Sequence, residues 1–137
     1  MKTIILIGCV KKKREYRTKA GDLYISPFFK KNLSYAKSLK PDSIFILSAK
    51  YGLVALDQEI DSYDLTLKNF KKDDLLIWSS KIIQQLQQVS NINKDRFIFL
   101  AGDKYRKYLI PNLINYEIPF KGLGIGKQLK QLKAKIG

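Results

Sequence analysis

Short uninterrupted apolar runs alternate along this chain with segments in which apolar residues recur at helical spacing. The runs lie at Thr3 to Ile7, Ser43 to Leu47 and Phe97 to Leu100, and they are rich in aliphatic and β-branched residues. Such runs are typical of strands that are buried on both faces of a sheet. Strands separated by helices pair in parallel through right-handed crossovers, so this order predicts an α/β fold.

Three longer segments show the helical spacing. The first begins at Pro27, with Ser26 before it as an N-cap, and ends before Pro41. The second extends from Lys72 to about Val89, and two aspartates in its first turn suit the positive end of a helix dipole. The third occupies residues 125–136 and has a narrow apolar stripe between lysines.

Two shorter elements are expected near the end of the chain. Asp103 is placed to cap a short helix that extends to Tyr108. Residues 116–120 form a fourth strand, whose Pro119 suits the edge of a sheet better than its centre.

The segments between these elements are a basic loop at residues 10–20 and an irregular acidic loop from Gly52 to Asn69. We therefore expect residues 1–137 to form a single α/β domain, a three-layer αβα sandwich around a mostly parallel sheet of about four strands. A chain of 137 residues is long enough to bury one core without disulfides or metals.

The counts of cysteine and histidine exclude several kinds of chemistry. Cys9 is the only cysteine, which excludes an internal disulfide and favours a cytoplasmic protein. Histidine is absent, so Ser-His and Cys-His catalysis and histidine-bound zinc are excluded. The opening MKTIILIGCV has too short an apolar run for a signal peptide or a membrane span and is interpreted as the first strand.

The net charge of +14 is concentrated at the two ends of the chain. Residues 1–40 hold eleven Lys and Arg against two acids, residues 41–120 ten against ten, and residues 121–137 five against none. Such a field attracts polyanions, so nucleic acid or a phosphorylated nucleotide is the expected partner. The alternative is that the lysines only keep the protein in solution.

Each of the three main strands ends in a turn of small residues followed by reactive side chains. In an open α/β sheet the carboxyl ends of the strands border the ligand crevice, so the three turns predict one shared site. Cys9 is itself a catalytic candidate, and the lysines that follow it suit an anion. The side chains after the other two strands could hold phosphate and stack on a base. These candidates are Cys9, Lys11 and Lys13 after the first strand, Ser48, Lys50, Tyr51 and Gly52 after the second, and Gly102, Lys104 and Tyr105 after the third.

The acidic loop supplies the carboxylates that catalysis needs. Cleavage of a glycosidic bond builds positive charge on the sugar, and a nearby carboxylate stabilises that charge or activates water. Asp61 and Asp64, which flank Tyr63, are the first candidates, and a solvated loop is the alternative. The acidic spacing matches no EF-hand loop, and we expect neither a metal nor a cofactor.

Several motifs together resemble a small bacterial family of unknown function that is often labelled YaaA-like. The motifs are GCVKKK, LYISPFFKKNLSYAKSL, FILSAKYGLV, YDLTL, FLAGDKYRKYLIPNL and GIGKQLKQL. The cysteine turn also resembles a segment of archaeosine synthase, which carries a domain similar to uracil-DNA glycosylases. The resemblance implies a flavodoxin-like or glycosylase-like fold that handles nucleic acid or nucleobases. It places family positions at Cys9, Lys11, Lys13, Tyr24, Ser26, Ser48, Lys50, Gly52, Tyr63, Asp64, Gly102, Tyr105 and Gly126.

The chain departs from these patterns at two points. Relatives tend to have Ser-Lys-Thr-Lys after the cysteine, where this chain has Val-Lys-Lys-Lys, and the water-activating and histidine motifs of uracil-DNA glycosylases are absent. The first hypothesis is an enzyme that cleaves or exchanges the N-glycosidic bond of a normal or modified base in nucleic acid or a nucleotide, and excision of uracil in particular is not expected. A non-catalytic nucleic-acid-binding protein and a small-molecule nucleotide enzyme are the alternatives. The sequence leaves the oligomeric state open.

Overall fold

The computed structural model describes residues 1–136 and has an α/β fold built around a five-stranded sheet. The strand order is β4-β3-β1-β6-β7, and only β4 is antiparallel to its neighbour. From one edge to the other, the strands are β4 (Gly52–Ala55), β3 (Ser43–Ser48), β1 (Thr3–Gly8), β6 (Arg96–Leu100) and β7 (Asn115–Glu117). The expected mostly parallel sheet is confirmed, with one more strand than the sequence indicated.

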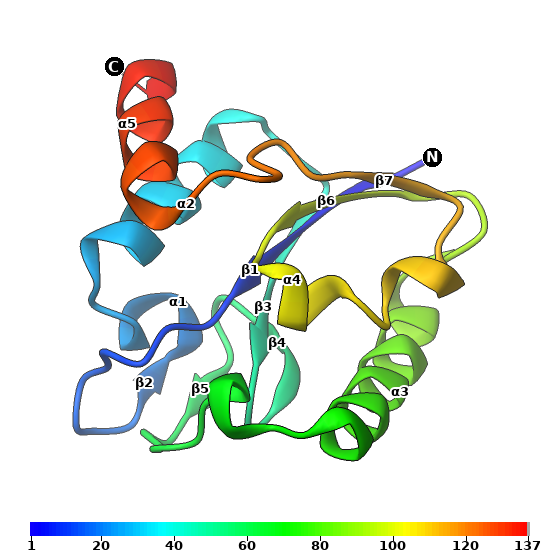
Figure 1. Cartoon of the computed structure of the whole chain (residues 1–137), viewed down its shortest axis with the longest axis horizontal. Helices are drawn as coiled ribbons and strands as arrows, with labels where there is room; N and C mark the ends of the chain where they lie inside the picture. Colours follow the sequence, from blue (N-terminus) through cyan, green and yellow to red (C-terminus); the bar gives the residue numbers. More distant parts are fainter. Residues whose placement is uncertain (137) are drawn as a thin grey trace.

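Helices cover both faces of this sheet (Figure 1). The helices α2 (Pro27–Ser38) and α5 (Ile125–Ile136) lie side by side on one face, and α3 (Lys72–Val89) packs on the other. The core is the central strand with its neighbours, because Ile4, Ile5, Leu6 and Ile7 are at most 1% exposed. None of the helices in the described chain combines the length and apolar character that crossing a lipid bilayer requires.

Local sequence signals determine where the main helices begin. The hydroxyl of Ser26 accepts a hydrogen bond from the Phe29 N–H at 3.1 Å, and Pro27 occupies the first helical position of α2. At the start of α3, the carboxylate of Asp74 accepts a hydrogen bond from the backbone N–H of Lys71 at 3.0 Å. Both helix starts were expected from the sequence.

Short elements connect the main strands and helices. The two-residue strands β2 (Thr18–Lys19) and β5 (Glu59–Ile60) pair with each other, and α1 (Ala20–Leu23) follows β2. Farther along the chain lie the 3-10 turn η1 (Leu67–Asn69), the short helix α4 (Asp103–Arg106) and the 3-10 turn η2 (Ile110–Asn112). Of these elements, η1 and α4 contribute side chains to a pocket.

Two details of the sequence prediction need correction. The N-cap of α4 is Gly102, and Asp103 is the first helical residue, without a side-chain capping bond. The segment that begins at Gly52 is not irregular throughout, because its first four residues form β4. Gly52 has a φ of 74°, which reverses the chain after β3, and Gln85 of α3 accepts the Leu53 N–H at 2.8 Å. The strand pairs with the adjacent β3 as a hairpin, but a four-residue run is too short to show alternation.

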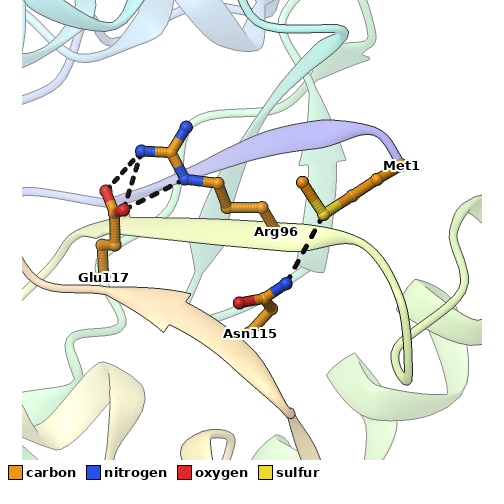
Figure 2. A network of polar contacts seen from close by, with 4 residues as sticks. All are labelled: Met1, Arg96, Asn115 and Glu117. Carbon is orange, nitrogen blue, oxygen red and sulfur yellow. Dashed lines mark hydrogen bonds and ion pairs between the residues drawn. The ribbon is translucent and has the colours of Figure 1, made fainter.

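The edge strand β7 is held to β6 by side chains (Figure 2). Arg96 of β6 donates three hydrogen bonds of 2.7–3.1 Å to the two carboxylate oxygens of Glu117 of β7. Asn115 contacts the Met1 sulfur at 3.4 Å, as Figure 2 also shows. The edge strand expected at residues 116–120 is confirmed as an edge, but it spans only Asn115–Glu117 and ends before Pro119, which has no N–H for strand pairing.

The strand order places a crevice at the carboxyl ends of β1 and β6. The chain passes from β1 outward to β3 and β4, and then returns to the opposite side of β1 to form β6. The register aligns Gly8 with Leu47 and Ile7 with Leu100, so the three strands end nearly level. A point where the strand order reverses is the usual ligand site of an open α/β sheet.

Candidate functional site

A pocket of about 630 Å³ opens where β1 and β6 end. Its floor and one wall come from the residues after β1 and from α4, and the opposite wall comes from the loop around η1. The lining residues are Cys9, Val10, Lys11, Asp64, Thr66, Leu67, Lys68, Asn69, Lys104 and Tyr105. We call it the main pocket.

Cys9 and Tyr105 form its floor. The Tyr105 hydroxyl donates a hydrogen bond to the Cys9 carbonyl oxygen at 2.7 Å and lies 3.4 Å from the Cys9 sulfur. A side chain at Gly8 would meet Ala101 and the Tyr105 ring at 3.3–3.4 Å, so the glycine lets this ring lie against β1. Burial raises the pKa of Tyr105, and the nearby Cys9 adds to the shift. The hydroxyl therefore stays protonated and acts as a donor.

A chain of hydroxyl groups continues from the end of β3 behind this floor. The Ser48 hydroxyl donates to the Tyr63 hydroxyl at 2.9 Å, which is hydrogen-bonded in turn to Tyr24 at 2.5 Å. The Ser48 oxygen also accepts the Tyr51 N–H at 3.1 Å. Burial raises the pKa of both Tyr24 and Tyr63, with Cys9 as the next contribution. These tyrosines and Cys9 thus share one weakly solvated environment.

Lys13 lies against this cluster of aromatic rings. Its ammonium nitrogen is 4.4 Å from the Tyr63 ring centroid and donates to the Lys11 carbonyl oxygen at 3.1 Å. Partial burial lowers the pKa of Lys13, while its electrostatic interactions with Cys9 and Asp64 oppose that shift. Cations over tyrosine faces are stabilised by the ring quadrupole, so Lys13 is positioned beside the tyrosines.

The two candidate aspartates are separated in the fold. Asp64 is exposed and lines the main pocket. Asp61 forms an exposed ion pair with Arg17 at 3.3 Å and is absent from the pocket lining. Only Asp64 of this pair is therefore placed to act on a ligand in this pocket.

Lys104 lines the pocket, but its ammonium group is already engaged. It donates hydrogen bonds to three backbone carbonyl oxygens of the opposite wall, those of Leu67 at 3.1 Å, Lys68 at 2.9 Å and Phe70 at 3.3 Å. An ammonium group has three protons, so these contacts use all of its donors. Lys104 ties α4 to η1 and holds the pocket open at its present width, whereas the sequence suggested that it binds phosphate.

The side chains after β3 lie beside the main pocket. The Lys50 ammonium is 5.4 Å from the Tyr51 ring centroid, and Lys50 lines a separate cavity of about 510 Å³ next to Trp78. Asn69 lines both cavities. Cys9 and Lys104 thus line the same pocket, as the sequence suggested. Lys50 lines the neighbouring cavity instead, so the three strand ends do not all contribute to one site.

Three of the four other candidate positions have structural explanations, and the fourth, Gly126, lies away from the main pocket. Ser26 and Gly102 are the N-caps of α2 and α4, and Gly52 occupies the turn with positive φ. Gly126 is exposed within α5 and lies outside the pocket lining.

The sequence prediction missed the wall formed by Thr66, Lys68 and Asn69. Trp78 was also missed, although its indole N–H donates to the Ser48 carbonyl oxygen at 2.9 Å and its ring packs against Tyr105. No local pattern marks these residues, because contacts from other elements place them. Across residues 1–136, no three Cys, Asp or Glu side chains lie together as a metal site requires.

The hydrogen bonds of Lys104 lead to a first prediction. Replacing Lys104 with methionine is expected to lower the free energy of unfolding by about 1–3 kcal/mol, because three carbonyl oxygens then have no charged donor. Amide hydrogen exchange in residues 64–70 is expected to accelerate. Lys107→Met is the matched control, since Lys107 is exposed and lies over the Tyr108 ring. Equal urea midpoints and equal exchange in both variants would contradict this role.

Comparisons with known proteins extend over nearly the whole chain. Residues 4–134 match the model of a family described as a family of unknown function, DUF6884. An uncharacterized protein of Bacillus subtilis strain 168, YfjM, is 30% identical over 116 residues, which cover 80% of this chain and 75% of the relative. No solved structure matches the chain significantly.

Proposed function

Because the chain belongs to the family of unknown function DUF6884, we propose a function from the chemistry of the main pocket: cleavage of an N-glycosidic bond in nucleic acid or a nucleotide. The observation that carries the proposal is the position of Asp64. It is an exposed carboxylate on the wall of a pocket at the carboxyl ends of β1 and β6.

The size and polarity of the pocket suit a nucleotide. Small-molecule sites are typically about 300–1,000 Å³, and this pocket of about 630 Å³ lies in that range. Lys11 and Lys68 are exposed on its lining and offer ammonium groups to a phosphate. The Tyr105 edge and Cys9 give a partly apolar floor for a base or sugar.

Asp64 has two roles in this proposal. As the bond between the base nitrogen and the sugar carbon breaks, the electron pair leaves with the base and positive charge develops on the sugar. The Asp64 carboxylate stabilises that charge and accepts a proton from the attacking water, whose oxygen bonds to the sugar carbon. The departing base takes up a proton from solvent, so the products are a free base and a sugar hydroxyl.

We propose in addition that the motif resemblance to YaaA-like proteins and to archaeosine synthase reflects the same class of substrate.

A non-catalytic nucleic-acid-binding protein is the second candidate. It is favoured by the charge, because the residues described include ion pairs only at Arg17–Asp61 and Arg96–Glu117, while the chain has 26 Lys and Arg. A small-molecule nucleotide enzyme is the third, and the pocket volume is compatible with it.

The proposal is tested by incubating the protein with DNA, RNA and mononucleotides, in modified and unmodified forms. Mass spectrometry then measures free bases in the filtrate. We expect one class of substrate to release base in molar excess over the protein. Binding without any release would favour the second candidate, and release from mononucleotides but not from longer chains would favour the third.

A further inference from the structure

A second cleft lies near the main pocket and is lined by cationic side chains. It has a volume of about 330 Å³ and lies between α1, α2 and the basic loop after β1. Its lining residues are Arg14, Gly21, Asp22, Tyr24, Lys30, Leu33, Ser34 and Lys37. We call it the basic cleft.

The lysines of the basic cleft come from one face of α2. Lys30, Ser34 and Lys37 are spaced four and three residues apart, which places them in a row along the helix, and all three are exposed. Within residues 1–136, no hydrogen bond or ion pair engages the ammonium groups of Lys30 and Lys37. Their charges are therefore available to an anion.

Arg14 is held in place on the other side of the cleft. Its backbone N–H donates to the Leu23 carbonyl oxygen at 2.9 Å, and its Nε donates to the Asp22 carbonyl oxygen at 3.0 Å. Its Nη1 donates to the hydroxyl of Tyr16 at 3.3 Å, and the Tyr16 side chain is 59% exposed. An exposed aromatic ring beside a fixed guanidinium is the arrangement that stacks on a base next to a bound phosphate.

The basic cleft and the main pocket are joined by the chain itself. Lys11 lines the main pocket and Arg14 the basic cleft, and three residues span at most about 11 Å. Tyr24 also connects them, because it lines the cleft while its hydroxyl bonds to Tyr63, whose neighbour Asp64 lines the main pocket. A linear polyanion of a few nucleotides is long enough to occupy both.

From this geometry we infer that the substrate is a single strand of nucleic acid, with its reacting nucleotide in the main pocket and a neighbouring phosphate in the basic cleft. The inference rests on the proposed function for the identity of the main pocket. Arg14, Lys30 and Lys37 bind the phosphodiester backbone, and Tyr16 stacks on an adjacent base. A single strand is required because bases in a duplex are not available for stacking on a protein side chain.

The test measures binding of fluorescent single-stranded DNA and RNA oligonucleotides, and of a mononucleotide, over a range of salt concentrations. The variant Lys30→Gln/Lys37→Gln is compared with Lys72→Gln/Lys94→Gln, which removes the same charge from exposed positions at α3 and before β6. We expect the first variant to bind oligonucleotides about tenfold more weakly. The slope of log affinity against log salt is expected to fall by about 1.4, since each phosphate neutralised on a single strand accounts for about 0.7 of the slope. Mononucleotide affinity is expected to stay unchanged.

Two single substitutions separate stacking from charge. Tyr16→Ala is expected to weaken oligonucleotide binding severalfold without changing the salt slope, and to leave binding of inorganic polyphosphate unchanged. Asp22→Asn removes an acidic side chain that lines the cleft and is expected to strengthen oligonucleotide binding. All the altered residues are exposed, so circular dichroism and melting temperatures are expected to match those of the wild-type protein.

Three results would overturn the inference. Equal losses of affinity in the two double variants would show that only the overall field attracts the strand. Equal affinities for the oligonucleotides and the mononucleotide would show that no second subsite exists. Unchanged oligonucleotide binding by Tyr16→Ala would remove the stacking interaction that distinguishes a nucleic-acid strand from polyphosphate. Base release that depends on Asp64 but not on the residues of the basic cleft would support the proposed function and contradict this inference.

Discussion

The Asp64→Asn variant is expected to release base at least about 10²–10³-fold more slowly than the wild-type protein, because removal of one group that stabilises transition-state charge has an effect of this size. Asparagine keeps the shape of the side chain but cannot carry the negative charge that the sugar cation needs. Asp64 is exposed and forms no ion pair within the described residues, so the free energy of unfolding is expected to change by less than about 1 kcal/mol. Initial rates of base release, measured by mass spectrometry, provide the comparison.

Asp61→Asn is the matched control for that experiment. It makes the same chemical change three residues earlier in the same loop, where it removes only the exposed ion pair with Arg17. We expect this variant to retain the wild-type rate, since exposed pairs contribute about 0–1 kcal/mol to stability. If Asp64→Asn and Asp61→Asn have the same rate, Asp64 is not the catalytic carboxylate.

The second large effect is a steep loss of stability at alkaline pH. Tyr24, Tyr63 and Tyr105 have pKa values raised mainly by burial, so they stay protonated in the folded protein when unfolded tyrosines ionise near pH 10. Their contribution to stability is complete below that unfolded pKa and is lost as the pH rises above it. With three protons bound only in the folded state, the free energy of unfolding falls by about 4 kcal/mol per pH unit above pH 11.

Urea unfolding curves at a series of alkaline pH values measure this slope, and tyrosinate absorbance reports the ionisation. Tyr63→Phe removes one of the three buried hydroxyls, so we expect the slope to fall to about 2.7 kcal/mol per pH unit. Tyr116→Phe removes a hydroxyl from an exposed side chain and is the control. A slope that is the same in wild type and Tyr63→Phe would show that this hydroxyl is not protected by burial.

Lys13 has the opposite effect on the pH dependence of stability, in a lower pH range. Its pKa is lowered in the folded protein, chiefly by burial, so the unfolded state binds the additional proton in the range just below pH 10.5. Its contribution therefore increases stability as the pH rises through that range. The measurement above pH 11 avoids this overlap.

The strands and main helices could be predicted from the sequence because their signals are local. The buried run of β1 and the Ser26–Pro27 start of α2 need only neighbouring residues to be recognised, and both are confirmed. The strand β4 was missed because four residues are too few to show alternation and because its Leu53 N–H bonds to Gln85, more than thirty residues away, although its strand partner β3 directly precedes it in the chain. A contact with a residue so distant in the sequence leaves little pattern in a short strand.

Part of the candidate site could also be predicted from the sequence. Cys9, Lys11, Asp64, Lys104 and Tyr105 were singled out from the sequence, and all five line the main pocket. The individual roles of these residues could not be predicted from their residue types. A lysine that binds phosphate and a lysine that bonds to backbone carbonyls have the same local sequence signals.

The amino-acid sequence by itself determined the α/β fold, the turns after the parallel strands and the concentration of positive charge at the two ends of the chain. These properties follow from hydrophobic periodicity, capping residues and composition, which act over a few neighbouring positions. Only the tertiary structure separated Asp61 from Asp64, turned Lys104 toward η1 and formed the basic cleft between α1 and α2. Hydrogen bonds, burial and charge are set by residues far apart in the chain, so these assignments required the folded arrangement.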